Sequence, residues 1–169
     1  IYIVSNGAQT RGLYETLQAG GTFDDALEKW EREPDAPNYT PRISATLDLK
    51  ACPERSQRDH HGKITLSILK ANPVNPELTD RFTYRPAASP PGLGVCLTTY
   101  VGDGKPLPSF RGEPLLLPCR GSAEEILDSY WDALDAENRV SLAVKQIPAH
   151  GGSSQIFIKN RFGDLGCDC

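Results

Sequence analysis

Hydrophobic residues that recur at every second position predict that strands make up most of this chain. In the segment 43–49, every second residue is apolar, from Ile43 to Leu49, which is the period of a strand with one buried face. The same alternation, or a short apolar run bounded by turn residues, predicts further strands at 1–4, 64–69, 81–84, 93–101, 115–117, 140–144 and 155–160.

Apolar residues at helical spacing are confined to fewer places. The clearest helix is predicted to begin after Ser122, because Glu125 completes a capping box and an apolar face follows. A similar start predicts a helix over 22–30, and a weaker helix is predicted at 9–19. Because most strands are joined by hairpin-scale connections, we predict an α+β fold with largely antiparallel sheets.

The charge is mildly acidic, with 22 acidic against 18 basic residues, which argues against a nucleic-acid-binding surface. No apolar run approaches the roughly 18–20 residues needed to cross a bilayer, and the sequence shows no signal-peptide pattern. We therefore expect a soluble, cytoplasmic protein with neither a nucleic-acid nor a membrane partner. The sequence contains no methionine, so we expect a processed product, a fragment or a trimmed chain.

The cysteines and histidines follow no recognised disulfide or metal pattern. Five cysteines are scattered without a C-x-x-C pair, so neither a disulfide framework nor a zinc site is predicted. Cys167 and Cys169 are assigned to a flexible tail, 163–169, with a soft-metal site or a strained bridge as the alternative. The adjacent histidines of the polar segment 53–62 are predicted to lie in a solvated hairpin turn. We expect no metal and no cofactor.

Two irregular, proline-rich segments carry most of the side chains suited to chemistry. The first, 31–43, holds carboxylates, an amide, a phenol and guanidinium groups on a backbone that its prolines keep stiff and non-helical. Tyr39 and Arg42 flank Pro41 at the entrance to a strand, which favours a binding or catalytic loop over the alternative of a solvated linker. The second segment, 102–114, again places polar groups among glycines and prolines.

The sequence lacks the motifs of common nucleophile-, nucleotide- and metal-dependent enzymes, such as G-x-S-x-G, G-x-x-x-x-G-K-[ST], G-x-G-x-x-G and H-E-x-x-H. The remaining chemistry is proton transfer and electrostatic stabilisation by Tyr, Arg, Lys, Glu and Asp side chains, without a metal. These groups suit additions, eliminations and hydrolyses at an activated carbon.

Several motifs of the chain resemble those of the IMP cyclohydrolase family. The two longest are GGTFDDALEKWEREPDAPNYTPRIS (20–44) and TYVGDGKPLPSFRGEP (99–114), and shorter ones are SNGAQT (5–10), LSILKAN (66–72) and ENRVSLAVK (137–145). The matches occur in the same order over nearly all of residues 1–162, which we therefore treat as one domain.

The resemblance implies an Ntn-hydrolase-like αββα sandwich, in which two largely antiparallel sheets lie between helical layers, without self-cleavage. The implied reaction is the last step of purine synthesis, the closure of 5-formamidoimidazole-4-carboxamide ribotide to IMP with loss of water. The carboxamide nitrogen attacks the formyl carbon, and the carbinolamine then expels hydroxide. The implied partner is this nucleotide substrate.

The resemblance also suggests roles for individual residues. The predicted catalytic residues are Tyr39 and Arg42, as donors to the developing formyl oxyanion, and Glu33 or Asp103, as the proton carrier. The predicted substrate-binding residues are Asn6, Asn38, Tyr100 and Ser109, together with Arg81 or Lys105 for the 5′-phosphate. Structural explanations stay open: Tyr39 packed over the core with Arg42 paired to an acidic neighbour, a plain surface turn at 103–105, and a left-handed turn at Asn6.

The chain also departs from the family pattern. Ala8 and Arg11 replace acidic residues, Thr98 replaces a histidine, Lys105 an asparagine and Arg111 a glutamate. An N-terminal segment of the family is missing, so we expect a homo-oligomer or a second chain that supplies its strands. Three functions therefore stay open: IMP cyclohydrolase, a cyclodehydratase or hydrolase of the same fold with another substrate, and a non-catalytic domain that binds nucleotides or a partner.

Overall fold

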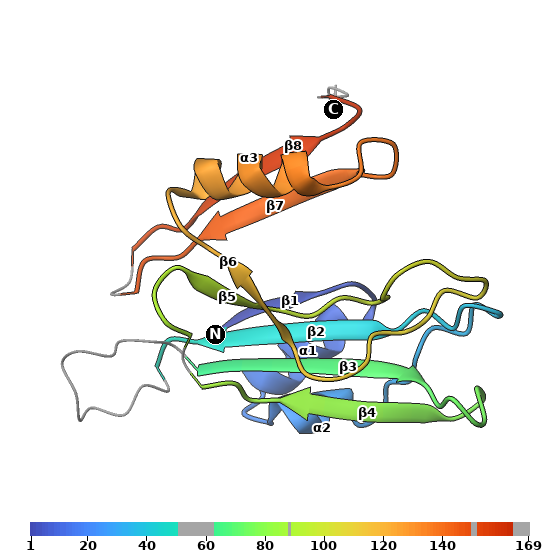
Figure 1. Ribbon diagram of the computed structural model, residues 1–169. Coiled ribbons are helices and arrows are strands. Elements are labelled where there is room, and N and C mark those ends of the chain that lie inside the picture. The colour runs from blue at the N-terminus through green and yellow to red at the C-terminus, as the bar shows by residue number, and fades with distance from the viewer. Residues whose placement is uncertain (51–62, 88, 150–151, 164–169) are drawn as a thin grey trace, which may run out of the picture. The chain divides into compact units, whose positions relative to one another are not determined.

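The computed structural model describes residues 1–50, 63–87, 89–149 and 152–163, and Figure 1 shows its backbone. Contacts within the chain divide it into two compact units. The first comprises Ile1–Ser89 and Val95–Leu117, and the second comprises Pro90–Gly94 and Pro118–Cys169. A single domain over residues 1–162 stays a prediction.

The first unit is built on an antiparallel sheet with the strand order β1-β2-β3-β4. Its strands are β1 (Tyr2–Ser5), β2 (Arg42–Asp48), β3 (Lys63–Ala71) and β4 (Thr79–Tyr84). In the register of these strands, Ile43 lies opposite Ile68, and Lys70 lies opposite Asp80. Since paired residues share a face, Lys70 and Asp80 stand side by side on the sheet.

Helices α1 (Gln9–Gln18) and α2 (Phe23–Leu27) cover one face of this sheet (Figure 1). Their buried residues form a core of Leu13, Phe23, Ala26 and Leu27, with Ile3 and Trp30 packed at its edge. The capping box predicted for the start of α2 is present between Thr22 and Asp25. The helix ends at Leu27, earlier than predicted, because the chain turns there: the Trp30 N–H and the Arg81 guanidinium both donate to the Leu27 carbonyl.

A second layer of strands lies over the face opposite to the helices. Strands β5 (Leu93–Cys96) and β6 (Leu115–Pro118) pair with each other, and each has residues assigned to both units. Within the first unit, Val95 and Leu97 share a cavity with Val4 and Ile43 of the sheet. Helices, sheet and second strand layer therefore follow one another in this unit, as expected for one side of a sandwich (Figure 1).

Both faces of β2 are covered, whereas the alternation in the sequence predicts one buried face. The most deeply buried residues of β2 are polar: Arg42 is 9% exposed, Ser44 is 4% exposed and Thr46 is 8% exposed. The apolar residues between them, such as Ile43, are only half-buried. Alternation identifies the apolar face, but which face is buried more deeply depends on what packs against it. Here the helices α1 and α2 pack against the polar face.

The second unit is a hairpin with one helix packed on it. It consists of α3 (Ala123–Ala133), β7 (Ser141–Gln146) and β8 (Gln155–Asn160), and the two strands pair in antiparallel fashion. The predicted capping box is formed by Ser122 and Glu125. Lys159 of β8 forms an ion pair of 2.7 Å with Asp128 of α3, which joins the hairpin to the helix.

Mixed helices and antiparallel sheets confirm the predicted α+β class. The predicted strand 93–101 is shorter than expected: β5 ends at Cys96, and the chain pairs again only as an isolated bridge between Tyr100 and Ser109. The predicted turn at 53–62 and the Cys167 and Cys169 tail lie outside the described residues. In the described part of the chain, no helix has the length and apolar character of a membrane span.

Candidate functional site

The two proline-rich segments predicted from the sequence meet over the sheet and enclose a cavity of 380 Å³, here called the Tyr39 cavity. Polar side chains from three parts of the first unit line it: Asn38 and Tyr39, Lys70 and Asp80, and Ser109 and Arg111. Small-molecule sites are typically cavities of about 300–1,000 Å³ with a few convergent polar groups. The Tyr39 cavity meets both conditions.

Tyr39 is held in a rare backbone conformation. Its φ of 45° lies in the left-handed region, which bulky residues adopt only where the surrounding structure stabilises it. The Cζ atom of Arg32 lies 4.3 Å from the centroid of the Tyr39 ring. The Arg32 Nε also donates to the Pro76 carbonyl at 2.7 Å. Arg32 thereby joins the Tyr39 ring to the loop after β3.

Asp35 fixes the backbone on both sides of Tyr39. Its carbonyl accepts from the Tyr39 N–H at 3.2 Å, and its carboxylate accepts from the Thr40 N–H at 2.7 Å and from the Thr40 hydroxyl. The hydroxyl bond lowers the pKa of Asp35, and slight burial opposes it. Because the Thr40 proton is engaged by a carboxylate, the Tyr100 hydroxyl, 2.7 Å from Thr40 Oγ1, is the donor in that second bond. Tyr100 therefore supports the loop that carries Tyr39.

Lys70 and Asp80 form the floor of the cavity where β3 ends and β4 begins. The Lys70 Nζ donates to the Phe110 carbonyl at 2.7 Å and lies 4.8 Å from the centroid of the Phe82 ring. Burial lowers the pKa of Lys70, the nearby Arg111 lowers it further, and Asp80 acts in the opposite direction. Asp80 accepts a hydrogen bond of 2.9 Å from the Asn72 amide.

The second loop is fastened at several points beside this floor. The Val101 N–H donates to the Pro108 carbonyl at 2.9 Å, and the Phe110 N–H donates to the Thr99 carbonyl at 3.0 Å. Phe110 is only 2% exposed and anchors the loop in the core. The Leu107 N–H reaches Asn38 Oδ1 at 3.4 Å, so the two loops also touch each other.

Arg111 gives the cavity a net positive character. It is exposed and, within the part of the chain that the structure describes, makes no hydrogen bond or ion pair. Together with Lys70 it faces one carboxylate, that of Asp80, among the residues that line the cavity. Two cations beside neutral hydrogen-bonding groups suit a small anion such as a phosphate ester.

Arg42 and Glu33, two predicted catalytic residues, lie together but do not line the Tyr39 cavity. Both Arg42 Nη atoms contact the Glu33 carboxylate, Nη2 at 2.8 Å, and Nη1 also donates to Gln9 Oε1 at 3.1 Å. The Arg42 Nε donates to the Glu31 carbonyl at 2.7 Å, and the guanidinium lies 5.0 Å from the Trp30 ring. The protein itself thus occupies the donors of Arg42, which fastens the start of the first loop to β2 and α1.

Asn6, a predicted binding residue, lies beside this cluster and is exposed. Its amide donates to the Pro41 carbonyl at 2.9 Å, and its Oδ1 accepts from the Ile43 N–H at 2.9 Å. Gly7 follows at a close approach, since a Cβ atom there would lie 2.8 Å from Arg42 Nη1. The SNGAQT motif therefore holds the entrance to β2, and Asn6 does not line the Tyr39 cavity.

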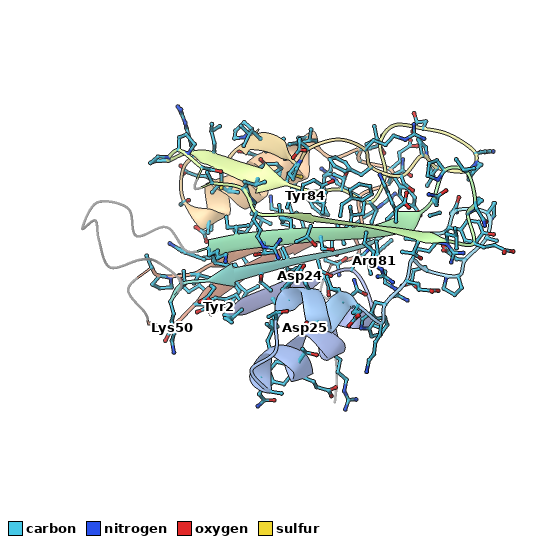
Figure 2. The ribbon with its side chains drawn as sticks, turned by 90° about the horizontal axis from the view of Figure 1, so that it is seen from below. Tyr2, Asp24, Asp25, Lys50, Arg81 and Tyr84 are labelled. Carbon is cyan, nitrogen blue, oxygen red and sulfur yellow. The ribbon has the colours of Figure 1, made fainter. Side chains whose placement is uncertain are left out.

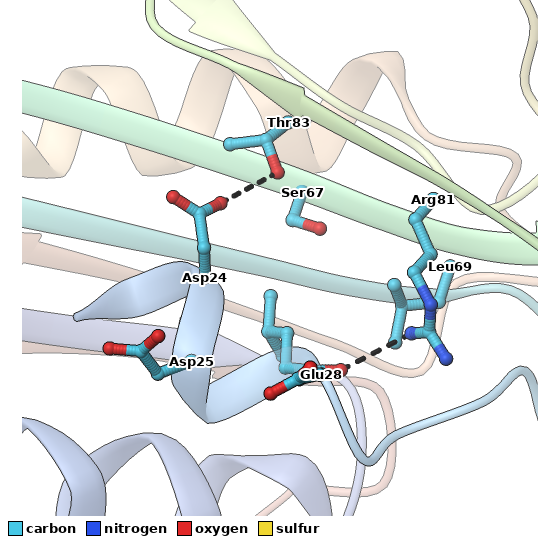
Figure 3. A pocket seen from close by; sticks show the side chains of 8 residues that line it. Asp24, Asp25, Glu28, Ser67, Leu69, Arg81 and Thr83 are labelled. Carbon is cyan, nitrogen blue, oxygen red and sulfur yellow. Dashed lines mark hydrogen bonds between the residues drawn. The ribbon is translucent and has the colours of Figure 1, made fainter. Parts of the chain in front are cut away.

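Arg81, a predicted phosphate ligand, faces the helices. It lines a separate cavity of 360 Å³ beside α2, which Figure 3 shows, and donates to the carbonyls of Leu27 and Trp30. In the same cavity, the Thr83 hydroxyl donates to Asp24 at 3.2 Å. Figure 2, seen from below, shows Asp24 of α2 and Arg81 of β4 on the side of the sheet where α2 lies. Because neighbouring residues of a strand point to opposite faces, Arg81 faces away from the cavity that Asp80 lines.

The remaining predicted residues are divided between the cavity and the surface. Asn38 and Ser109 line the Tyr39 cavity, as Tyr39 itself does. Asp103 and Lys105 are exposed on the second loop and do not line it. Among the described residues, no group of three or more His, Cys, Asp or Glu side chains is placed to bind a metal ion.

Sequence reasoning missed Lys70 and Asp80, and it noted Arg111 only as a departure from the family pattern. Lys70 lies in the LSILKAN motif, and this motif could have pointed to Lys70 as a site residue. The hydrophobic pattern, however, marked Lys70 only as the end of a strand. Asp80 immediately precedes Arg81 in the chain. Only the register of β3 with β4, which pairs Asp80 with Lys70, identifies Asp80 rather than Arg81 as the residue that lines the cavity.

The chain has an α+β fold and a polar cavity with two cationic side chains, Lys70 and Arg111. The chain belongs to the IMP cyclohydrolase-like protein family, whose model matches residues 1–151. This match confirms the resemblance that the sequence motifs indicate, and membership of the family indicates hydrolase activity in general terms. No curated protein and no solved structure matches the chain.

Proposed function

We propose that this protein is an IMP cyclohydrolase that closes 5-formamidoimidazole-4-carboxamide ribotide to IMP in purine biosynthesis. Family membership supports this reaction class. The structural observation that carries the proposal is the Tyr39 cavity. The Tyr39 phenol, carried on a backbone in the left-handed conformation, lines this cavity together with two cationic side chains. A cytoplasmic location and the expected partner chain or homo-oligomer stay predictions.

The substrate needs a group that binds its phosphate and a group that stabilises the oxygen of its formyl carbon. Arg111 is suited to the phosphate, since its guanidinium has no protein acceptor among the described residues and can donate two parallel hydrogen bonds. Asn72 and Ser109 line the same cavity and offer neutral donors. These three residues form the proposed phosphate site.

Tyr39 is the proposed donor to the formyl oxygen. Negative charge develops on this oxygen when the carboxamide nitrogen attacks, and a preorganised hydroxyl stabilises it without reorganisation. The contacts of Arg32 and Asp35 with Tyr39 and Thr40 supply that preorganisation. Arg42 takes a different role from the one expected from the sequence: it positions the first loop through Glu33 and Gln9.

The proposal is tested by incubating the purified protein with the formamido ribotide and following IMP by ultraviolet absorbance. We expect turnover by the wild-type protein and a loss of about 100- to 1,000-fold in kcat for Tyr39→Phe, which removes one donor. Tyr14→Phe is the matched control, because Tyr14 lies on α1 and is 56% exposed. Absence of IMP formation by the folded wild-type protein would contradict the proposal and favour another substrate or a non-catalytic role.

A further inference from the structure

Building on the proposed function, we propose that Lys70 is the residue that carries the proton during ring closure, first as general base and then as general acid. Lys70 lines the Tyr39 cavity at the end of β3, on the same wall as Asp80. Neither the proton carriers expected from the sequence nor the family match assigns a role to it.

The surroundings of Lys70 place its amine in the cavity. Its Nζ is anchored by one hydrogen bond to the Phe110 carbonyl, at 2.7 Å, and rests 4.8 Å from the Phe82 ring centroid. The Lys70 Nζ uses one hydrogen bond to hold its place, and its other hydrogen-bonding positions remain for a ligand. The charged or titratable groups around it are Asp80 on β4, Arg111 on the second loop and Tyr39 on the first loop.

These surroundings favour the neutral amine more than water does. Burial lowers the pKa of Lys70 below its ordinary value of 10.5, and the positive charge of Arg111 lowers it further, against the opposing effect of Asp80. The neutral fraction of Lys70 at neutral pH is therefore larger than that of a lysine with the ordinary value. A neutral amine accepts a proton, whereas an ammonium ion only donates one.

The proposed reaction has two steps that balance through Lys70. First, the carboxamide nitrogen forms a bond with the formyl carbon, the neutral Lys70 amine accepts the proton from that nitrogen, and the formyl oxygen becomes the carbinolamine oxygen beside Tyr39. The Lys70 ammonium returns this proton to that oxygen, which gives the neutral carbinolamine. Second, the neutral Lys70 amine accepts the N–H proton of the former formamide nitrogen, and this nitrogen forms a double bond to the carbon while the carbon–oxygen bond breaks. The Lys70 ammonium donates the proton to the departing hydroxide, which leaves as water. The amine returns to its neutral form, and no oxidant or reductant is required.

The other candidates are less suited by their contacts. Glu33 is bound to the Arg42 guanidinium, and Asp103 is exposed on the second loop without lining the cavity. Asp80 lines the cavity, but its carboxylate accepts the Asn72 amide and stands beside Lys70. Asp80 is better suited to orient Lys70.

The first test uses the wild-type protein and needs no turnover. Trace labelling with acetic anhydride across a pH series, read by mass spectrometry, measures the fraction of each lysine that is neutral. We expect the labelling midpoint of Lys70 to lie below 10.5, the ordinary value for a lysine. Exposed Lys63, on the same strand, serves as the reference for reagent reactivity. A Lys70 midpoint at or above the ordinary value overturns the proposal, whatever the activity.

The second test is the pH dependence of kcat/KM with the formamido ribotide. We expect wild-type activity to fall as the pH drops through the Lys70 midpoint, because the amine is then protonated and cannot act as a base. Lys70→Arg keeps the positive charge but does not titrate in this range, so we expect kcat to fall about 100- to 10,000-fold. The remaining activity should no longer decline as the pH drops through the Lys70 midpoint. Lys63→Gln is the control and keeps wild-type activity.

Chemical rescue separates a proton carrier from a residue that only supports the loop. We expect ethylamine to restore part of the activity of Lys70→Ala in a concentration-dependent way. Full activity in Lys70→Arg, in a wild-type protein that forms IMP, overturns the role of Lys70 and leaves the cyclohydrolase function standing. A folded wild-type protein that forms no IMP overturns both, so the two failures are distinguishable.

Discussion

The guanidinium carbon of Arg32 lies 4.3 Å from the centroid of the Tyr39 ring, and this contact joins the two sides of the loop that carries Tyr39. Arg32 is held from the other side by the Pro76 carbonyl at 2.7 Å, so the stacked pair is tied to the connection between β3 and β4. Tyr39 is therefore positioned by a residue that does not line the cavity.

Removing the Arg32 guanidinium should weaken the positioning of Tyr39 while leaving the Tyr39 side chain in place. A cation–π contact at an exposed site contributes about 0.5–1 kcal/mol, so we expect Arg32→Ala to lower kcat about two- to fivefold. Arg11→Ala is the control, since Arg11 forms a surface pair with Glu15 on α1. In a Tyr39→Phe background, Arg32→Ala should have a much smaller effect. Equal effects in both backgrounds would show that Arg32 does not act through Tyr39.

The clamp between Asp35 and Thr40 should make stability depend on pH. Hydrogen bonding by Thr40 lowers the pKa of Asp35 from its ordinary 3.8, so the stabilisation is present above that value and is lost as the pH falls through the lower folded-state pKa. Since Asp35 is exposed, we expect Asp35→Asn to lower the free energy of unfolding by only about 0.5 kcal/mol at pH 7.

Urea denaturation at pH 7 and at a pH below the Asp35 titration measures this difference. The gap between wild type and Asp35→Asn should shrink at the lower pH. The control is Asp132→Asn, an exposed residue of α3, for which we expect no such change. A gap that stays constant with pH would mean that the Asp35 charge does not stabilise the loop.

Arg42 should matter for stability more than for chemistry. Lysine keeps the charge but cannot bind Glu33 with two nitrogens while reaching Gln9 and the Glu31 carbonyl, so we expect Arg42→Lys to cost about 2 kcal/mol in free energy of unfolding. Arg11→Lys, at a side chain that is 85% exposed, should change it little. Unchanged stability of Arg42→Lys combined with lost turnover would instead support the catalytic role expected from the sequence.

Arg111 should control affinity for the phosphate group. A charged hydrogen bond contributes about 1.5–3 kcal/mol, so we expect Arg111→Ala to weaken IMP binding about 10- to 100-fold in isothermal titration calorimetry. Exposed Arg120 in the second unit provides the control Arg120→Ala. Inosine, which lacks the phosphate, should bind wild type and Arg111→Ala equally. A loss of inosine affinity in the variant would assign Arg111 to another part of the ligand.

Local patterns were sufficient to predict most of the elements. The capping boxes at Thr22 and Ser122 depend on residues three positions apart, and the strand β7 depends on its own alternation, so each can be predicted without knowledge of the fold. The two proline-rich segments, which the sequence predicts to carry functional groups, meet at one cavity, and their functional role stays a prediction.

Pairing and packing decide the features that the sequence did not predict. Asp80 and Arg81 are neighbours in the chain, but strand pleating sends Asp80 to the Tyr39 cavity and Arg81 to α2. Lys70 becomes a site residue through its register with Asp80, which lies on another strand. Arg42 looked available beside Tyr39 in the sequence, yet the fold places Gln9 and Glu33 around its guanidinium.

The position of bound IMP tests most directly whether the Tyr39 cavity is the active site. In a crystal structure of the protein soaked with IMP, we expect the phosphate beside Arg111 and the purine carbon derived from the formyl group beside the Tyr39 hydroxyl and Lys70. IMP bound in the cavity beside α2, with its phosphate on Arg81, would contradict this assignment and return the phosphate site to Arg81, one of the two residues expected from the sequence.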